Sequence, residues 1–486
     1  MKKIITLMLL ASILISTISC GSETDNTVTD DTSEAISDTV GTTSTEVSDD
    51  LPDINFGGKT FNVLTFDFIK DDFVAEELNG DVVNDAIYNR DRTVSERFGV
   101  NITYNAENDF SSSTKLIKSS ILAGDNEFQL VANHVIDIGT LATEGLFLNW
   151  YDVPYINFSK PWWAKSTTDD LTINGDKAVL AIGDYVLSTL KGTYCYYYDK
   201  KFAEDYHLEN LYDVVESGKW TLEYLENTIK DIYSDLNGNA KQDSYDFYGL
   251  TQSVGSPMEA YFWAFGGKIF NIDDGTPELV YENEHTADIV SAVYALVNET
   301  SGVTSKREQY NDYHEFASMA FVDDLTLFAP GTLLMATKHF RTKTNEYGII
   351  PYPKFDENQE SYKTMVDGYH AVLTVPKTID DPEFVGIITE ALNAESRRQV
   401  FPAYYETALK KKYTYDDESV KLLDMIVDSR VFDFGFVYDG WKGFGFYLEN
   451  IINSTKSDNF ASYYASHSEA AIQHYDKVIA ALTGEE

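Results

Sequence analysis

One short segment of the chain carries oxygen-bearing residues at regular loop positions. Between residues 235 and 246, side-chain oxygens stand at positions 1, 3, 5, 9 and 12, and position 7 offers a backbone carbonyl. The residues at these positions are Asp235, Asn237, Asn239, Lys241, Asp243 and Asp246. Such a ring of oxygens suits a hard cation, although Ala240 replaces the usual turn glycine and Asp246 is shorter than the usual glutamate. The spacing predicts one structural calcium ion, with a metal-free turn rich in Asp and Asn as the alternative.

Tryptophans beside turn-forming residues are a second set with chemical potential. Trp162 and Trp163 follow a proline, Trp263 stands three residues before a Gly-Gly pair, and Trp441 follows a glycine. A ring exposed on such a loop can stack on the apolar C–H face of a sugar, while Asp and Asn bind the hydroxyls. The alternative for each tryptophan is packing in the core, and that is what we expect of Trp220, just before a helix cap.

Motifs of known catalytic or nucleotide-binding sites are absent from the sequence. It has no Walker A pattern, no G-x-G-x-x-G, no H-E-x-x-H and no G-x-S-x-G. The S-x-x-K match at Ser112–Lys115 lies in a serine-rich run without its partner motifs, so we interpret it as chance. Cys195 lies in a strand-like aromatic run and is expected to be buried and unreactive. We predict no enzymatic activity, although a catalytic pair of carboxylates among the 79 acidic residues stays open as an alternative.

The segments that must position these residues have an α/β pattern. The order of a strand at 59–66, a helix at 84–98 and a strand at 100–104 favours a parallel sheet with a crossover helix. A third strand is expected at 128–132, and Thr221 is the expected N-cap of another helix. Later strands are expected at 348–351 and 371–376, with a final helix at 468–483.

The first 53 residues have a different character. Residues 1–20 combine two lysines, an apolar run and Cys20, and they resemble a bacterial lipoprotein signal in which Cys20 becomes the lipid-modified first residue. A plain secretory signal is the alternative. Residues 21–53 contain ten acids and no basic or aromatic residue, so they are predicted to form a disordered tether. We expect the protein at the extracellular face of the cytoplasmic membrane, held by a lipid on Cys20.

Composition excludes several classes of protein. Lys and Arg number 37 and Asp and Glu 79, so the formal charge is 37 − 79 = −42, which argues against binding of nucleic acid. Two cysteines cannot build a disulfide framework. Aromatic residues make up 14 % of the 486 residues, too many for a disordered chain.

The body from residue 54 to 486 resembles the extracellular solute-binding proteins of ABC importers, in particular the family-1-like group associated with sugars. The segments that carry the resemblance are 84–92, 98–100, 141–146, 160–163, 196–200, 218–221, 348–354 and 375–377. The resemblance implies an α/β, two-lobed fold of the type II periplasmic-binding-protein kind, with a hinge and an interlobe cleft that closes on a ligand. It places lobe 1 at 54–190 and 365–400, and lobe 2 at 191–364 and 401–486. It also implies a monomer that docks on permease subunits.

Ligands in such lobes lie at the carboxyl ends of strands, and this rule selects the candidate ligand-binding residues. The candidates near predicted strand ends and crossings are Phe66, Asp67, Asn133, His134, Asp184, Trp263, Asp367, Tyr369 and His370. Trp162, Trp163 and Trp441 are added as aromatic platforms.

The sequence therefore predicts a lipid-anchored binding protein that captures a carbohydrate, with an oligosaccharide favoured, and delivers it to an ABC importer. Two alternatives stay open. One is a surface-attached enzyme or lectin that acts on polysaccharide. The other keeps the binding-protein fold but changes the ligand to a peptide or a polyamine, which the acidic body permits.

Overall fold

The computed structural model of the protein describes residues 47–273, 275–405 and 417–484. The predicted signal segment, Cys20 and most of the predicted tether lie outside these residues. The fold below is that of residues 48–486, which form one compact unit. Within the described part of the chain, no helix is long and apolar enough to cross a membrane.

Contacts with the folded body begin earlier than the sequence suggested. Asp49 is only 8 % exposed, and its carboxylate pairs with Arg97 at 2.5 Å and with Arg398 at 3.6 Å. Residues 48–53, which we predicted to be part of the disordered tether, therefore pack against the body. Their acidic composition hid this contact, because it depends on guanidinium groups that are distant in the sequence.

A first, four-stranded sheet has the order β13-β3-β1-β2. β1 pairs in parallel with β2 and β3, while β13 pairs antiparallel with β3. The elements are β1 (Lys59–Phe66), α1 (Val82–Phe98), β2 (Val100–Glu107), α2 (Phe110–Ala123), β3 (Leu130–His134) and β13 (Ala371–Thr374). The predicted β-α-β opening is confirmed.

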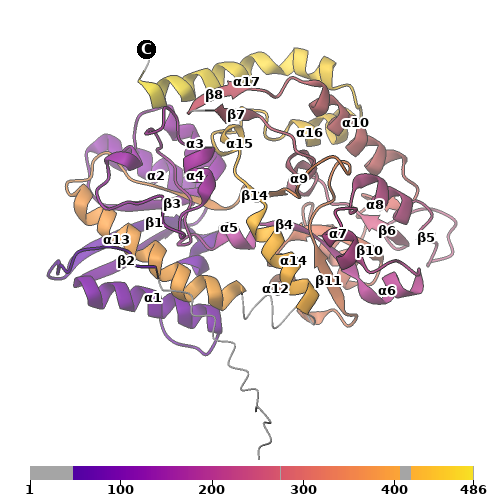
Figure 1. Ribbon diagram of the computed structural model, residues 1–486, viewed down its shortest axis with the longest axis horizontal. Helices are drawn as coiled ribbons and strands as arrows, with labels where there is room; N and C mark the ends of the chain where they lie inside the picture. The colour runs from indigo at the N-terminus through magenta and orange to yellow at the C-terminus, as the bar shows by residue number, and fades with distance from the viewer. Residues whose placement is uncertain (1–46, 274, 406–416, 485–486) are drawn as a thin grey trace, which may run out of the picture. The chain divides into compact units, whose positions relative to one another are not determined.

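Helices cover the first sheet. α1 contacts α13 (Pro382–Glu395), and the two run side by side in Figure 1. α2 packs on β1 and β3 and contacts α3 (Val135–Ala142). α1 ends at Gly99, whose φ of 59° lies in the left-handed region, and a Cβ there would come within 2.4 Å of Asn55. Only glycine fits this helix end, which fixes where β2 begins.

A second sheet is built mainly from the middle of the chain. Its main path has the order β11-β4-β10-β6-β5, with β9 paired to β6. β10 runs antiparallel to β4 and parallel to β6. The strands are β4 (Tyr194–Asp199), β5 (Tyr233–Ser234), β6 (Phe247–Thr251), β9 (Val303–Thr304), β10 (Thr326–Thr332) and β11 (Tyr347–Ile350). Cys195 in β4 is fully buried and free, as predicted.

The remaining elements are mostly helical. Thr221 caps α8 through a hydrogen bond from the Tyr224 amide, as predicted. The helices are α4 (Lys165–Asp169), α5 (Ser188–Lys191), α6 (Lys200–Asp205), α7 (Leu211–Glu216), α8 (Leu222–Ile229), α9 (Ser256–Ala264), α10 (Glu284–Glu299), α11 (Phe316–Val322), α12 (Leu334–Lys338), α14 (Asp417–Asp428), α15 (Phe434–Val437), α16 (Tyr447–Glu449) and α17 (Phe460–Thr483). The short strands are β7 (Phe270–Asp273), β8 (Thr276–Leu279), β12 (Thr364–Met365) and β14 (Arg430–Val431).

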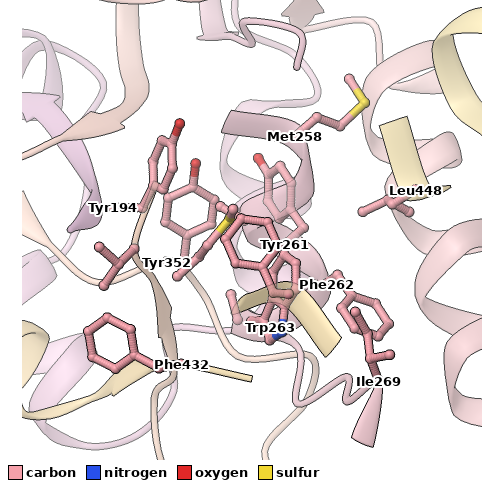
Figure 2. Packing of buried hydrophobic residues seen from close by; sticks show 14 of the residues in the cluster. Tyr194, Met258, Tyr261, Phe262, Trp263, Ile269, Tyr352, Phe432 and Leu448 are labelled. Atoms are coloured by element: carbon pink, nitrogen blue, oxygen red, sulfur yellow. The ribbon is translucent and has the colours of Figure 1, made fainter. Parts of the chain in front are cut away.

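Trp263, which we expected on a loop, packs in the core around α9. Figure 2 shows the side chains of α9 packed among aromatic residues from distant segments. The ring of Tyr261 lies 5.1 Å from that of Tyr352, and the ring of Trp263 lies 4.9 Å from that of Phe436. Trp263 is 2 % exposed, and residues 257–264 of α9 are all buried, so the core surrounds this helix. Trp220 is also fully buried, as expected.

Candidate ligand-binding cleft

A cavity of about 1200 Å³ opens where loops of the two sheets meet. One wall comes from the carboxyl ends of β1 and β3 and from the start of α2. The other comes from the starts of α9 and α11, from the β10–α12 connection, and from the chain between residues 439 and 450. Ligands of α/β folds bind at the carboxyl ends of strands, so this cavity is the candidate site.

Four rings form an offset stack on the cavity wall. Phe110 and His134 have centroids 4.4 Å apart, His134 and Trp441 are 6.0 Å apart, and Trp441 and Phe446 are 5.1 Å apart. The three interplanar angles are 18°, 15° and 16°. His134 ends β3 of the first sheet and Phe110 begins α2, which packs on that sheet, whereas Trp441 and Phe446 lie near the end of the chain. The stack therefore joins both walls.

Trp441 keeps much of its ring free within this stack. Its residue is 55 % exposed. Planes in van der Waals contact are about 3.5–4 Å apart, so a centroid distance of 6.0 Å to His134 means a lateral offset of roughly 4–5 Å. Trp441 also has a φ of 62°, in the left-handed region that side chains rarely adopt. The loop thus holds an aromatic ring in a costly conformation at the cavity, which is typical of functional sites.

Asp439 organises the loop that carries Trp441. Its buried carboxylate accepts a hydrogen bond from the Gly445 amide at 2.9 Å. A Cβ at Gly443 would come within 2.5 Å of the same oxygen, so the loop closes only with glycine there. Burial raises the pKa of Asp439 to about 7, although the amide hydrogen bonds act against this rise.

The wall opposite the first sheet combines tyrosine with charged groups. The hydroxyl of Tyr313 donates to Glu449 Oε1 at 3.1 Å, and the guanidinium of Arg307 lies 4.8 Å from the centre of the Tyr313 ring. Lys338 Nζ lies 2.7 Å from both carboxylate oxygens of Glu315. These contacts fix the side chains that face the first wall.

Five of the twelve candidate ligand-binding residues line the cavity, namely Phe66, His134, Asp367, Tyr369 and Trp441. Phe66 and His134 are the last residues of β1 and β3, where the strand-end rule placed them. Asp367 accepts a hydrogen bond from the hydroxyl of Tyr194, and the ring of Tyr369 meets that of Phe68 edge to face at 5.2 Å.

The paired tryptophans lie elsewhere, in the core beside α13. Trp162 and Trp163 are 1 % and 5 % exposed, and their indole N–H groups donate to the two oxygens of Glu390 at 2.9 and 3.0 Å. Burial raises the pKa of Glu390 to about 7, while both indoles oppose the rise. These rings anchor the loop before α4 and do not line the cavity.

The other five candidates do not line the cavity either. Asn133 is fully buried and donates to Thr114. His370 is fully buried, and burial lowers its pKa to about 4. The carboxylate of Asp184 lies 3.4 Å from Arg397; burial raises its pKa to about 6, against the pull of that arginine. Asp67 is exposed beyond the strand end, and Trp263 packs in the core around α9.

The loop proposed for calcium is closed by its own hydrogen bonds. Asp235 accepts from the amides of Gly238 and Ala240 at 2.7 and 2.8 Å, and Asp246 accepts from the Leu236 amide at 3.2 Å. Asn239 donates to Asp243 at 2.7 Å. Across the residues that the structure describes, no group of three or more His, Cys, Asp or Glu is gathered to hold a metal ion. Calcium binding stays a prediction of the sequence pattern.

Several lining residues were not selected from the sequence. They are Phe68, Phe110, Tyr313, Phe446 and Glu449. Phe68 and Phe110 had a usable signal, because each lies within three residues of the end of a first-sheet strand. The rest come from loops and short helices on the far wall, where no strand end or periodic pattern marks them.

Comparisons with solved structures identify the type of fold. No family model and no curated protein matches the chain. Among solved structures, the ABC substrate-binding protein Lmo0181 of Listeria monocytogenes, in complex with cycloalternan, aligns with a TM-score of 0.52 at 11 % identity, over 85 % of this chain and 98 % of that one. UspC of M. tuberculosis aligns with a TM-score of 0.55 at 11 % identity, over 85 % and 99 %.

The GacH receptor of Streptomyces glaucescens, described both unliganded and with acarbose, aligns with a TM-score of 0.50 at 12 % identity, over 88 % of this chain and all of that one. At these identities the likeness concerns the fold. The chain has the α/β, two-lobed fold of the periplasmic-binding-protein type, with its cavity between the two sheets.

Proposed function

We infer that the protein is a solute-binding protein that captures a carbohydrate in this cavity and delivers it to the permease subunits of an ABC importer. The observation that carries the inference is the ring stack that joins both walls, with the half-exposed indole of Trp441 in it. Flat rings bind the apolar faces of sugars, and neighbouring carboxylates accept hydrogen bonds from hydroxyls. Two structures with this fold are described with cycloalternan and acarbose.

The size of the cavity favours an oligosaccharide. Its volume of about 1200 Å³ exceeds the roughly 300–1000 Å³ of most small-molecule pockets. A ligand of several rings would contact both walls at once, and binding would then favour a closed arrangement of the two lobes. The protein would bind and release its ligand without changing it.

The cellular setting is part of the same proposal. The lipoprotein-like segment that ends at Cys20 supports anchoring at the extracellular face of the cytoplasmic membrane. A monomer held by a lipid on Cys20 would reach both the surrounding medium and a permease in the same membrane.

The test is a thermal-shift and calorimetric screen of the purified full-length chain against mono- and oligosaccharides, peptides and polyamines. A specific ligand at 100 times its dissociation constant stabilises the fold by about 2.7 kcal/mol. We expect stabilisation by an oligosaccharide, and about tenfold weaker binding after Trp441→Ala. Tyr206→Ala is the matched control, since Tyr206 is 41 % exposed but does not line the cavity.

Three results would contradict the proposal. Stabilisation by peptides or polyamines alone would show that the ligand is not a carbohydrate. Release of shortened glycans would indicate an enzyme. Binding to insoluble polysaccharide, without affinity for any soluble oligosaccharide, would indicate a lectin.

A further inference from the structure

Carboxylates are the main charged groups on the cavity wall. Six of them line it: Asp109, Asp312, Glu315, Asp367, Asp439 and Glu449. Two lysines, Lys338 and Lys442, also line it, so the formal charge of the lining is 2 − 6 = −4 with histidine counted as neutral. Lys338 is held by both oxygens of Glu315, so this pair cancels.

The other five carboxylates accept hydrogen bonds from neutral donors only. Asp109 accepts from the amide and hydroxyl of Ser112, and Asp312 accepts from the amides of His314 and Glu315. Within the described part of the chain, none of the five has a lysine, arginine or histidine nitrogen within 4.0 Å. None of the five therefore has a directly contacting cation in the described part of the chain, so a positively charged ligand would not have to break a salt bridge there.

A buried polar atom on the same wall also lacks a partner. Asp439 is 1 % exposed, and its Oδ1 has no hydrogen-bond partner among the described residues, whereas Oδ2 is held by the Gly445 amide. A buried carboxylate oxygen is costly to leave without a donor. Burial also raises the pKa of this carboxyl, against the pull of the amides around it. A positively charged ligand in the cavity would interact favourably with this buried carboxyl through its charge.

We propose that the ligand is a saccharide that carries protonated amino groups, an oligosaccharide of free amino sugars. This inference rests on the proposed function, because the aromatic stack supplies the surface for sugar rings. The ammonium groups would lie among the unpaired carboxylates, and the π-face of Trp441 favours cations as well as C–H groups. A linear polyamine would satisfy the charge but has no ring face for the stack.

The experiment compares matched ligands on the full-length chain by calorimetry. The probes are glucosamine and glucose, and the β-1,4-linked trimers of glucosamine, N-acetylglucosamine and glucose. The three trimers share the sugar ring and the linkage, and they differ only in the substituent at C2 of each ring. We expect the glucosamine trimer to bind at least about tenfold tighter than the glucose trimer at low salt. The advantage should shrink in about 0.5 M NaCl, where charges are screened within a few ångströms.

Charge-removing variants make the test specific. Asp109→Asn and Asp312→Asn keep the side-chain oxygen that caps α2 and the turn before α11, so the fold should be retained. The double variant should lower the affinity for the glucosamine trimer several-fold and the affinity for the glucose trimer much less, because an amide oxygen still accepts a hydrogen bond from a hydroxyl but carries no charge. Asp288→Asn, at an exposed position of α10 away from the cavity, is the control and should change neither affinity.

The outcomes separate this inference from the function on which it rests. Equal or tighter binding of a neutral saccharide overturns the amino-sugar inference and leaves carbohydrate capture standing. A glucosamine advantage that the double variant does not reduce also overturns the placement among these carboxylates. Binding of none of these probes overturns the amino-sugar inference alone, and stabilisation by polyamines or peptides alone in the wider screen overturns carbohydrate capture as well.

Discussion

The indole of Trp441 donates a hydrogen bond to Asp137 Oδ2 at 3.2 Å, and the same oxygen lies 2.9 Å from His134 Nδ1. One carboxylate on α3 therefore fixes two neighbouring rings of the stack. Trp441 belongs to one wall of the cavity and His134 to the other. The contacts of Asp137 with both rings therefore hold the two walls together. Asp137 itself does not line the cavity, so its effect on a ligand would be indirect.

Replacing Asp137 should consequently weaken binding by freeing the rings. We expect Asp137→Ala to lower saccharide affinity by about fivefold to tenfold, equivalent to the roughly 1–1.4 kcal/mol of one lost hydrogen bond. Asp137→Asn retains one acceptor oxygen and should keep most of the affinity. Isothermal titration of both variants checks this, and equal affinities for the two would show that Asp137 does not position the stack.

The sequence predicted the first wall of the cavity better than the second. Phe66 and His134 were found because β1 and β3 read as strands, and the ends of parallel strands meet at one edge. Tyr313 and Glu449 could not be found this way, because they follow no strand and meet only through the tertiary fold. Trp263 was misplaced for a related reason: α9 is buried on opposite faces, so it lacks the one-sided pattern that marks a helix in sequence.

The carboxyl of Glu390 should make stability depend on pH. Burial raises its folded pKa from 4.5 to about 7, so folding takes up a proton between these values. The native state therefore loses stability as pH rises through this window, by at most about 3 kcal/mol. In Glu390→Gln the group no longer ionises, and one of the two indole N–H groups loses its acceptor oxygen.

Melting temperatures of wild type and Glu390→Gln between about pH 5 and 8 measure this effect. We expect the wild type to lose more stability than the variant as the pH rises, even though the variant is less stable at pH 5. The buried carboxyls Asp433 and Asp439 contribute equally to both proteins and cancel in the comparison. Parallel pH profiles would refute a raised pKa at Glu390.

If the oxygens of residues 235–246 form a calcium site, the loop should bind calcium weakly. The oxygens of Asp235 and Asp246 already accept amide hydrogen bonds, which an ion would have to replace. A dissociation constant of about 1 mM, at the weak end for extracellular sites, gives about 1.4 kcal/mol at 10 mM calcium. We expect a small rise in melting temperature that Asp235→Ala abolishes and magnesium does not reproduce. An unchanged melting temperature at 10 mM calcium would leave the loop as a metal-free turn.

Anchoring through Cys20 can be tested against the second cysteine of the same chain. Burial of an acyl chain contributes about 0.8 kcal/mol per CH₂, so a lipidated Cys20 should hold the protein in the membrane fraction until detergent is added. Cys20→Ala should move it to the soluble extracellular fraction. Cys195→Ala is the control, because Cys195 is fully buried in β4 and burial raises its thiol pKa, so it is not accessible for modification. If Cys20→Ala stays with the membrane, the uncleaved apolar segment of residues 4–18 holds the protein there and the lipid anchor is wrong.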